Sequence, residues 1–299
     1  MKQLLFVYNP KAGRQRAKTM LSDVLTVFAQ EGYQITVRPT LGPGDATQVV
    51  ADTAAHYDRV VCCGGDGTLN ETVGGLLSLP QEERPVLGYI PAGPTHDFSR
   101  NINLPRSTQE LARVACGGVP RSIDVGDLGG RQFLYIAAFG LFTDVSYSTP
   151  QASKNLLGHL AYVLQGAGRL VNFPSYQVKV TTDQGLEVEG EFIYGMVSNT
   201  VSIGGMVNLP RDLVCLDDGQ FEALLIRTPK TAKDWQSILT ALTTQKLPED
   251  GSVVGFTCSQ AHFTSPKPLA WTVDGEFGGD YTDLTISNRS RVLTIACGN

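Results

Sequence analysis

A glycine-rich loop that contains a carboxylate is the part of this sequence with the clearest chemistry. Residues 63–71 read Cys-Gly-Gly-Asp-Gly-Thr-Leu-Asn-Glu and follow an apolar stretch that is typical of a buried strand. The glycines allow the backbone to turn tightly and approach a ligand, and the N–H groups of a following helix attract an anion. The pattern therefore predicts a phosphate-binding loop, in which Asp66 indicates a metal ion or a proton acceptor. The alternative is a plain strand-turn-helix connection that Asp66 only caps.

Two further loops also follow apolar stretches. Residues 9–14 read Asn-Pro-Lys-Ala-Gly-Arg, in which Lys11 or Arg14 could neutralise phosphate oxygens. Asn9 could bridge to the glycine-rich loop, because the carboxyl ends of neighbouring parallel strands converge. The third loop, residues 90–98, offers Thr95 and Asp97 to the same crevice. Three loops of this kind together favour a nucleotide site, although residues 9–14 alone could be a solvated basic turn.

Two acidic turns lie in the second half of the chain. Residues 272–276 contain Asp274 and Glu276 on either side of a glycine, and residues 216–220 contain Asp217 and Asp218. Adjacent carboxylates and carbonyls are ligands that hard cations prefer. Asp-Gly is also a common pair in tight hairpins, so an ordinary turn stays open for both segments.

The elements that must position these loops change in character near residue 120. Before it, strand-like and helical stretches alternate, which predicts a parallel sheet covered by helices on both faces. Thr68 and Glu71 have the spacing of a capping box, which predicts a helix start at Thr68. After it, short β-rich stretches at hairpin spacing predict an all-β sandwich, interrupted by helices at 153–170 and 232–245. We expect an α/β nucleotide-binding domain at residues 1–122 and a β-sandwich at residues 123–299 whose last residues can return to the first domain, with the site between them.

Composition excludes several classes of protein. The 299 residues are 42% hydrophobic and 18% charged, as in ordinary globular proteins, and the net charge is −5. A generic nucleic-acid binder needs a basic field, so nucleic acid is not an expected partner. The six cysteines show no metal-ligand spacing, which predicts reduced thiols in a cytoplasmic protein. No apolar stretch is long enough for a transmembrane segment or a signal peptide.

The combined motifs resemble the diacylglycerol kinase catalytic-domain family, most closely its soluble bacterial lipid kinases. Four segments carry the resemblance, and they are Asn9-Pro-x-x-Gly13, Gly64-Gly-Asp-Gly-Thr-x-Asn-Glu71, Pro91-x-Gly-x-x-x-Asp-Phe98 and Asp274-Gly-Glu276. The Gly-Gly-Asp-Gly-Thr core also occurs in NAD kinases. The Asn-Glu extension and the late Asp-Gly-Glu favour the lipid branch.

The resemblance implies an α/β nucleotide domain followed by a β-sandwich, with ATP and Mg²⁺ as cofactors and a lipid hydroxyl, typically that of diacylglycerol, as acceptor. It implies that Gly65, Asp66, Gly67, Thr68, Leu69, Asn70 and Glu71 hold the ATP phosphates, that Thr40 contacts the nucleotide and that Glu276 is the proton acceptor. The loops themselves add Asn9, Arg14, Gly64 and Thr95 as nucleotide contacts, Asp66 as the rival base, and Asp66, Asp97 or Asp274 as carboxylates for the Mg²⁺. The resemblance places a structural Mg²⁺ on Asp218 with the backbone of Cys215 and Gln220, and the lipid side of the site at Lys154 and Asp274.

One loop departs from the family pattern. Pro94 removes a hydroxyl and a backbone N–H at a position that touches nucleotide in the family, and His96 replaces an asparagine. Thr95 can take over the lost hydroxyl. An NAD kinase-like enzyme with a soluble substrate and a regulator that binds nucleotide or lipid without catalysis therefore stay open, as do a homodimer and a peripheral association with the membrane surface that presents the lipid.

Overall fold

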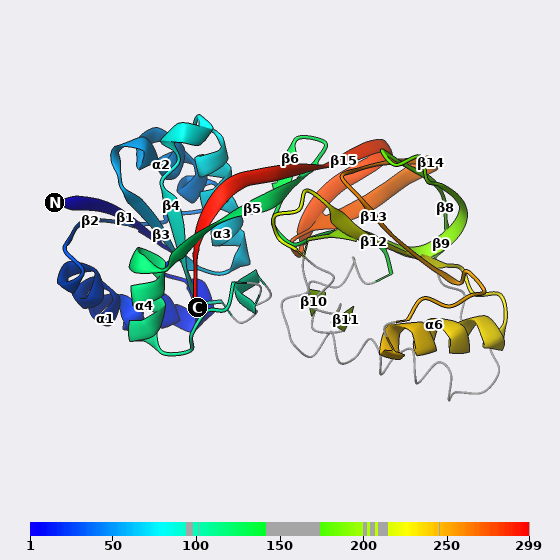
Figure 1. Cartoon of the computed structure of the whole chain (residues 1–299), viewed down its shortest axis with the longest axis horizontal. Coiled ribbons are helices and arrows are strands. Elements are labelled where there is room, and N and C mark those ends of the chain that lie inside the picture. The colour runs from blue at the N-terminus through cyan, green and yellow to red at the C-terminus, as the bar shows by residue number, and fades with distance from the viewer. Residues whose placement is uncertain are drawn as a thin grey trace. The chain divides into compact units, whose positions relative to one another are not determined.

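The computed structural model places the chain in two compact units (Figure 1). The N-terminal unit comprises Met1–Val125 and Ser290–Asn299, and the β-rich unit comprises Gly126–Arg289. The structure describes residues 1–93, 98–100, 102–141, 174–199, 202–203, 207–208, 215–244 and 246–298. The final strand thus begins in the β-rich unit and ends in the N-terminal one.

The N-terminal unit is built on a parallel sheet with the order β2-β1-β3-β4, which β15 extends beyond β4. Its strands are β1 (Lys2–Tyr8), β2 (Tyr33–Pro39), β3 (Arg59–Gly64) and β4 (Val86–Pro91). Its helices are η1 (Ala12–Gln15), α1 (Arg16–Gln30), α2 (Asp45–Thr53), η2 (Ala54–His56), α3 (Asp66–Leu77), η3 (Gln81–Glu83), η4 (Phe98–Arg100) and α4 (Thr108–Gly117).

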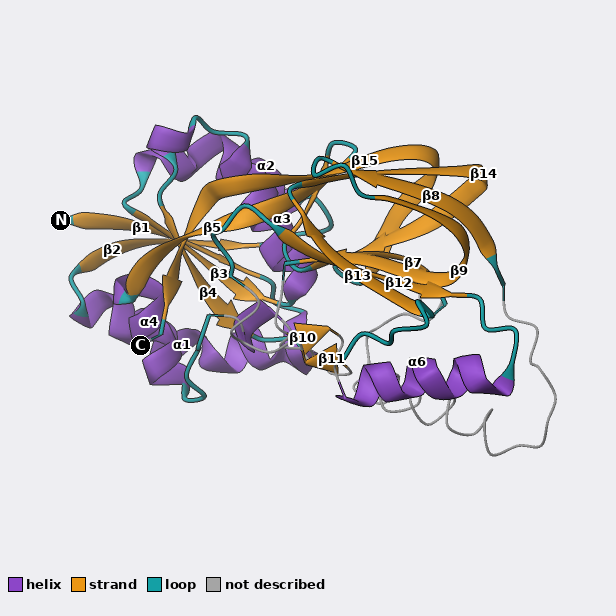
Figure 2. Cartoon of the chain, turned by 45° about the vertical axis from the view of Figure 1, so that its right-hand side comes forward, coloured by secondary structure: helices purple, strands orange, loops and turns teal. Residues whose placement is uncertain are grey.

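Helices cover both faces of this sheet (Figure 2). Helices α1 and α4 pack together over one face, and α2 and α3 pack together over the other. The inner strands β1, β3 and β4 are largely apolar because both of their faces are buried, whereas the edge strand β2 is partly exposed. In β1, for example, Leu4 and Phe6 join the core under α1, and the alternate residues Leu5 and Val7 are equally buried. The expected α/β class of this half is confirmed.

The β-rich unit consists of antiparallel strands and one described helix. Its strands are β5 (Val119–Leu128), β6 (Arg131–Phe133), β7 (Ile136–Gly140), β8 (Tyr176–Thr182), β9 (Glu187–Ser198), β10 (Ser202–Ile203), β11 (Val207–Asn208), β12 (Phe221–Arg227), β13 (Val253–Cys258), β14 (Gln260–Val273) and β15 (Glu276–Cys297), of which β5 and β15 are shared with the N-terminal unit. The helix α6 (Ala232–Thr244) follows the prediction for residues 232–245 closely. The expected β class is confirmed.

The strands of this unit close on one another, which differs from a sandwich of two separate sheets. Both β7 and β8 pair with β9 and with β14, so these four strands form a ring. Strand β14 pairs with β8 before a bend and with β7 after it. The bend lies between Thr264 and Leu269, where the register with β15 shifts and where Pro266 and Pro268 cannot donate to the ladder. The short β-rich stretches predicted from the sequence are here parts of two long, bent strands, β14 and β15.

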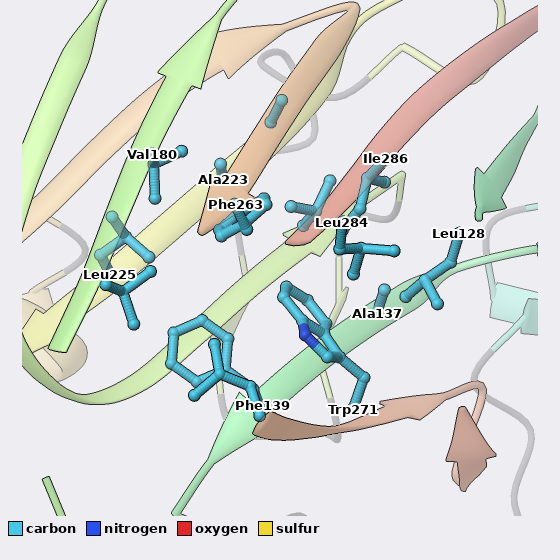
Figure 3. Packing of buried hydrophobic residues seen from close by; sticks show 14 of the residues in the cluster. Leu128, Ala137, Phe139, Val180, Ala223, Leu225, Phe263, Trp271, Leu284 and Ile286 are labelled. Carbon is cyan, nitrogen blue, oxygen red and sulfur yellow. The ribbon is translucent and has the colours of Figure 1, made fainter. Parts of the chain in front are cut away.

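The interior of the ring is an aromatic core (Figure 3). Trp271 packs against Phe139 and Phe263 with ring centroids 5.0 Å apart in each case. Helix α6 covers the opposite face of β9 and β12, where Trp235 and Ile238 are buried. Burial of these aromatic rings stabilises the β-rich unit.

Candidate active site

The glycine-rich loop joins β3 to α3, and residues 65–67 at the start of the helix are partly exposed among the described residues. Gly65 is the N-cap of α3 and contributes no side chain there. A Cβ on Gly64 would lie 2.6 Å from Cβ of Thr68, so glycine is needed at this position for packing. A Cβ on Gly65 would meet, within 4 Å and among the described residues, Cα of Gly93 at 3.8 Å. The first N–H groups of a helix have no partners within it, so this loop is suited to bind an anion.

The capping box predicted at Thr68 and Glu71 is wrong. Helix α3 begins at Asp66, and the carboxylate of Glu71 accepts hydrogen bonds from the N–H groups of Gly44 (2.8 Å) and Ala46 (3.3 Å) at the start of α2. The N-cap of α2 is Gly44, which has no side chain to satisfy those donors, and α2 packs against α3. Glu71 therefore caps the neighbouring helix.

Asn9 links the loop after β1 to the helix after β3, as the sequence predicted. Its side-chain Nδ2 donates to Oγ1 of Thr68 (3.2 Å), and its backbone N–H donates to the carbonyl of Cys63 (2.9 Å). Strands β1 and β3 are neighbours, while their following helices, α1 and α3, lie on opposite faces of the sheet. This is the point at which open α/β sheets bind ligands.

Two more strand ends meet the same region. The N–H of Thr40, just after β2, donates to the carbonyl of Tyr8 (2.9 Å). The N–H of Ala92, just after β4, donates to the carbonyl of Gly64 (2.8 Å). The predicted convergence of strand-end loops is therefore confirmed for their described parts.

Tyr89 is a residue of this region that the sequence interpretation missed. It is fully buried in β4, its hydroxyl donates to the carbonyl oxygen of Gly64 (3.4 Å), and the carboxylate of Asp66 lies nearby. Burial and the nearby Asp66 raise the pKa of Tyr89 well above its ordinary value, so it stays a neutral donor. A tyrosine inside an apolar strand was the available signal, but its partner depends on the sheet register.

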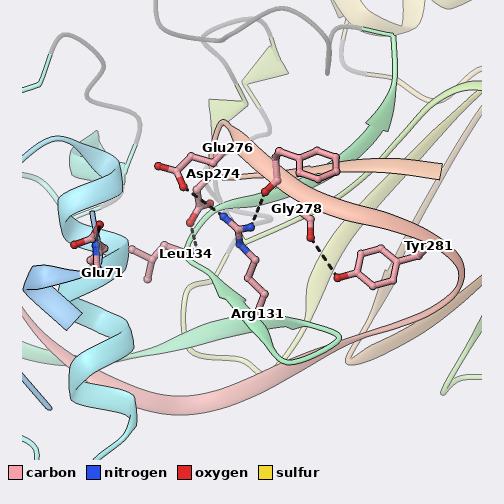
Figure 4. Close-up of polar contacts among 9 residues, drawn as sticks. Glu71, Arg131, Leu134, Asp274, Glu276, Gly278 and Tyr281 are labelled. Carbon is pink, nitrogen blue, oxygen red and sulfur yellow. Dashed lines mark hydrogen bonds and ion pairs between the residues drawn. The ribbon is translucent and has the colours of Figure 1, made fainter. Parts of the chain in front are cut away.

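The Asp-Gly-Glu segment forms a tight turn between β14 and β15. Asp274 and Gly275 both have positive φ (48° and 83°), which a type I′ hairpin turn requires, and Val273 pairs with Glu276. Asp274 is only 9% exposed. Its Oδ2 accepts from the N–H of Leu134 (2.7 Å), and its Oδ1 accepts from the next two N–H groups, at 3.1 and 3.2 Å (Figure 4). The segment is thus both a hairpin turn and an anchor to the chain before β7.

Glu276 is exposed at the start of β15. Its Oε2 lies 3.3 Å from Nη2 of Arg131, and Nη1 of the same arginine donates to the carbonyl of Phe277 (2.6 Å) (Figure 4). Arg131 was not among the predicted site residues, because it lies 145 positions away in the sequence. Nothing local in the sequence marks this pair.

The second acidic turn, residues 215–220, contains the predicted Mg²⁺ ligands and is held by local hydrogen bonds. Oδ1 of Asp218 accepts from the N–H of Gln220 (2.9 Å), and Sγ of Cys215 donates to Oδ1 of Asp217 (3.0 Å), which raises the pKa of the thiol. A carboxylate with backbone carbonyls suits a hard cation. Within the part of the chain that the structure describes, no three His, Cys, Asp or Glu residues are grouped as a metal site. The Mg²⁺ site therefore stays a prediction.

Several predicted site residues lie outside the described residues. They are Thr95, Asp97 and Lys154, together with Pro94, His96, the helix at 153–170 and the side chain of Arg14. Apart from the turn with Cys215, Asp218 and Gln220, the described site residues fall into two groups. Asn9, Thr40, Gly64, Gly65 and Asp66 gather in the N-terminal unit, and Asp274 and Glu276 gather in the β-rich unit.

Residues 3–128 match the family model of the diacylglycerol kinase catalytic domain. The chain is 34% identical over 281 residues to a diacylglycerol kinase of Bacillus subtilis (strain 168), with 93% of this chain and 91% of the relative covered. It is 32% identical to a diacylglycerol kinase of Staphylococcus aureus (strain bovine RF122 / ET3-1), with coverage of 93% and 87%. The chain belongs to the diacylglycerol kinase family. As a member it is a kinase, a phosphotransferase that acts on an alcohol.

The fold of the family agrees with the one described above. A crystal structure of a diacylglycerol kinase from Bacillus anthracis str. Sterne superposes with a TM-score of 0.75 at 24% identity, and covers 99% of this chain and 97% of that one. Among the described residues, no helix has the length and apolar character needed to cross a membrane.

Proposed function

We propose that this protein is an ATP- and Mg²⁺-dependent lipid kinase that transfers the γ-phosphate of ATP to the hydroxyl of diacylglycerol, giving phosphatidate. The observation that carries the proposal is the open glycine-capped start of α3 at the β1/β3 switch point, within a chain whose relatives are diacylglycerol kinases. Catalysis of phosphoryl transfer consists mostly of positioning the phosphates and neutralising their charge. The N–H groups at the start of a helix can hold a triphosphate in this way.

In the proposed site the ATP phosphates lie on residues 64–68 at the start of α3. Gly65 gives them access to the backbone, and the hydrogen bond from Asn9 to Thr68 holds the loop after β1 beside them. Thr40 contacts the nucleotide from the end of β2. A bound Mg²⁺ would neutralise phosphate charge, and Asp66, oriented by Tyr89, with Asp97, provides carboxylates for it.

The lipid hydroxyl is proposed to enter at the Asp-Gly-Glu turn. Glu276 takes its proton, the oxygen attacks the γ-phosphorus in line, and the bond from phosphorus to the β,γ-bridging oxygen breaks to release ADP. Asp274 serves this step by holding the turn, and Lys154 contacts the substrate. Phe277, next to Glu276, is 62% exposed and is the one exposed aromatic residue among the large hydrophobic side chains described. Its position favours an apolar acceptor.

Substitution of Gly65 tests the nucleotide half of the proposal. Gly65→Ala adds a methyl group on the open side of the loop, so we expect normal folding and at least tenfold weaker ATP binding by calorimetry. Gly117→Ala, at the end of α4 with no described atom within 4 Å of the new Cβ, is the matched control and should bind ATP normally. Equal ATP affinity in both variants would show that the phosphates lie elsewhere.

Product analysis tests the acceptor. Labelled ATP, Mg²⁺ and either a panel of lipids or NAD are supplied to the wild type and to Glu276→Gln. We expect labelled phosphatidate with the wild type, and no product but normal ATP binding with Glu276→Gln. Labelled NADP would indicate the soluble-substrate alternative, and ATP binding without any product would indicate a regulator. Full turnover by Glu276→Gln would transfer the role of base to Asp66.

A further inference from the structure

Arg131 holds the Glu276 carboxylate and the backbone that follows it with one rigid group. The guanidinium is planar, so its two contacts, Nη2 to Oε2 of Glu276 (3.3 Å) and Nη1 to the carbonyl of Phe277 (2.6 Å), are fixed relative to each other. The carboxylate therefore cannot rotate independently of its own strand without losing one of the two contacts. We propose that Arg131 is the positioning residue of the phosphoryl transfer, which orients Glu276 to accept the proton of the lipid hydroxyl. This inference rests on the proposed role of Glu276.

Arg131 is itself held at the start of a short hairpin. The turn between β5 and β6 is Gly129-Gly130, with φ of 58° and 97°, and Leu128 pairs with Arg131 across it. Oδ1 of Asp127 accepts from the N–H of Gly130 (2.7 Å). The guanidinium thus extends from a turn whose backbone is already constrained.

The segment 131–136, which runs from β6 into β7, and the hairpin β14–β15 are joined by reciprocal contacts (Figure 4). From β14–β15, the carboxylate of Asp274 binds the backbone N–H groups of residues 134–136. From β5–β6, the guanidinium of Arg131 binds the carbonyl of Phe277. Asp274 thus holds the chain that leads from β6 into β7, Arg131 of β6 holds the backbone just after Glu276, and Glu276 lies between these two contacts in the sequence.

The ion pair between Arg131 and Glu276 is not explained by a contribution to folding stability. The side chains of Arg131 and Glu276 are 43% and 64% exposed, and ion pairs this exposed contribute little to folding. A base that must meet a substrate has to be accessible, and an accessible carboxylate needs a partner to fix its direction. A displacement of about 1 Å in a reacting group can reduce a rate by about a hundredfold. The benefit of Arg131 is therefore expected in the rate.

The chain offers a matched control for this proposal. Lys179 and Glu187 form a second exposed ion pair in the same unit, at 2.8 Å and with side chains 43% and 60% exposed, between β8 and β9. Lys179→Gln removes one cation and one exposed pair, as Arg131→Gln does, but Lys179 pairs with Thr264 of β14, away from the end of that strand at which Val273 pairs with Glu276. The two variants differ in whether the lost partner is the proposed base, and Arg131→Gln also loses the hydrogen bond to the carbonyl of Phe277 that holds the base in place.

The test compares kcat and KM for wild type, Arg131→Gln, Arg131→Lys and Lys179→Gln with diacylglycerol vesicles and ATP. We expect kcat to fall about a hundredfold in Arg131→Gln and less in Arg131→Lys, with KM for ATP and the urea midpoint unchanged. Lys179→Gln should match the wild type. Ethylguanidinium added to Arg131→Ala should restore part of kcat, whereas ethylammonium at equal ionic strength should restore less.

Glu276→Gln, measured in parallel, separates the two levels of the argument. If it is inactive, and Arg131→Gln lowers kcat about a hundredfold while Lys179→Gln does not, the positioning role is supported. If it is inactive and Arg131→Gln turns over normally, the role of Arg131 is overturned while that of Glu276 stands. If Glu276→Gln is fully active, the proposed base is wrong, and the inference fails with it. An equal loss in Lys179→Gln and Arg131→Gln would also overturn the inference.

Discussion

Replacement of Asp274 by asparagine should loosen the turn that carries Glu276. The change keeps the size of the side chain but replaces one carboxylate oxygen with an NH₂ group, which can only donate. Asp274 accepts three backbone N–H groups while 9% exposed, at 2.7, 3.1 and 3.2 Å. If the amide oxygen keeps the two longer contacts, the NH₂ group faces the N–H of Leu134, donor against donor. The shortest hydrogen bond is then lost.

The size of the effect follows from these three contacts. A buried donor left without an acceptor costs about 1–3 kcal/mol, and each of the two remaining bonds loses roughly 0.5–1 kcal/mol as its acceptor changes from charged to neutral. The free energy of unfolding should therefore fall by about 2–5 kcal/mol. That is a large part of the roughly 5–15 kcal/mol typical of a protein domain.

Tryptophan fluorescence during urea unfolding can measure this loss. The chain has two tryptophans, Trp235 in α6 and Trp271 in β14, and both are buried in the β-rich unit. The signal therefore reports the unit that contains the turn. Asp280→Asn makes the same chemical change at an exposed position of β15 and serves as the control.

The result that would refute the reasoning is a common urea midpoint for the two variants. Equal stability would mean that the three N–H contacts of Asp274 contribute nothing to the hold on the turn. We also expect ATP affinity to be unchanged in Asp274→Asn, because the loops that we propose to bind the nucleotide belong to the other unit. The loss of activity should then appear in turnover with the lipid.

Three further outcomes follow from the structure. Glu71→Ala should lower the free energy of unfolding by about 1–2 kcal/mol, because it removes the acceptor for the N–H groups at the start of α2. Chemical denaturation measures this loss, and an unchanged midpoint would contradict the capping role. Burial raises the pKa of Glu222 from 4.5 to about 8, so between these pH values the folded state keeps a proton that the unfolded state releases. Stability therefore falls as pH rises through this range. Glu222→Gln should flatten that decline in urea titrations at a series of pH values. Burial also raises the pKa of the thiols of Cys62 and Cys258 to about 12, so exposed Cys215 should be the one thiol that reacts with Ellman's reagent before unfolding, and rapid reaction of a second thiol would contradict this.

Local features of the chain were predictable because they depend on neighbouring residues. The glycine-rich loop, the Asp-Gly turn and helix α6 follow from backbone freedom, positive φ and apolar periodicity over short stretches. The alternation of strands and helices before residue 120 was sufficient for the α/β class, and the resemblance of four short motifs was sufficient for the family. Even the bond from Asn9 to the next loop could be anticipated, because parallel strands end at the same edge of a sheet.

The partners of the charged side chains were decided by the tertiary structure. The same Glu71 that has the spacing of a capping box caps α2, because packing brings a side-chain-free N-cap within its reach. Arg131 meets Glu276, and Tyr89 meets Asp66, through strand registers that join distant parts of the chain. Residue type and spacing determine which backbone shapes and which chemistry are available to this protein. Strand pairing and burial then decide which groups meet, since a hydrogen bond needs two atoms within about 3 Å and sequence distance does not limit that approach.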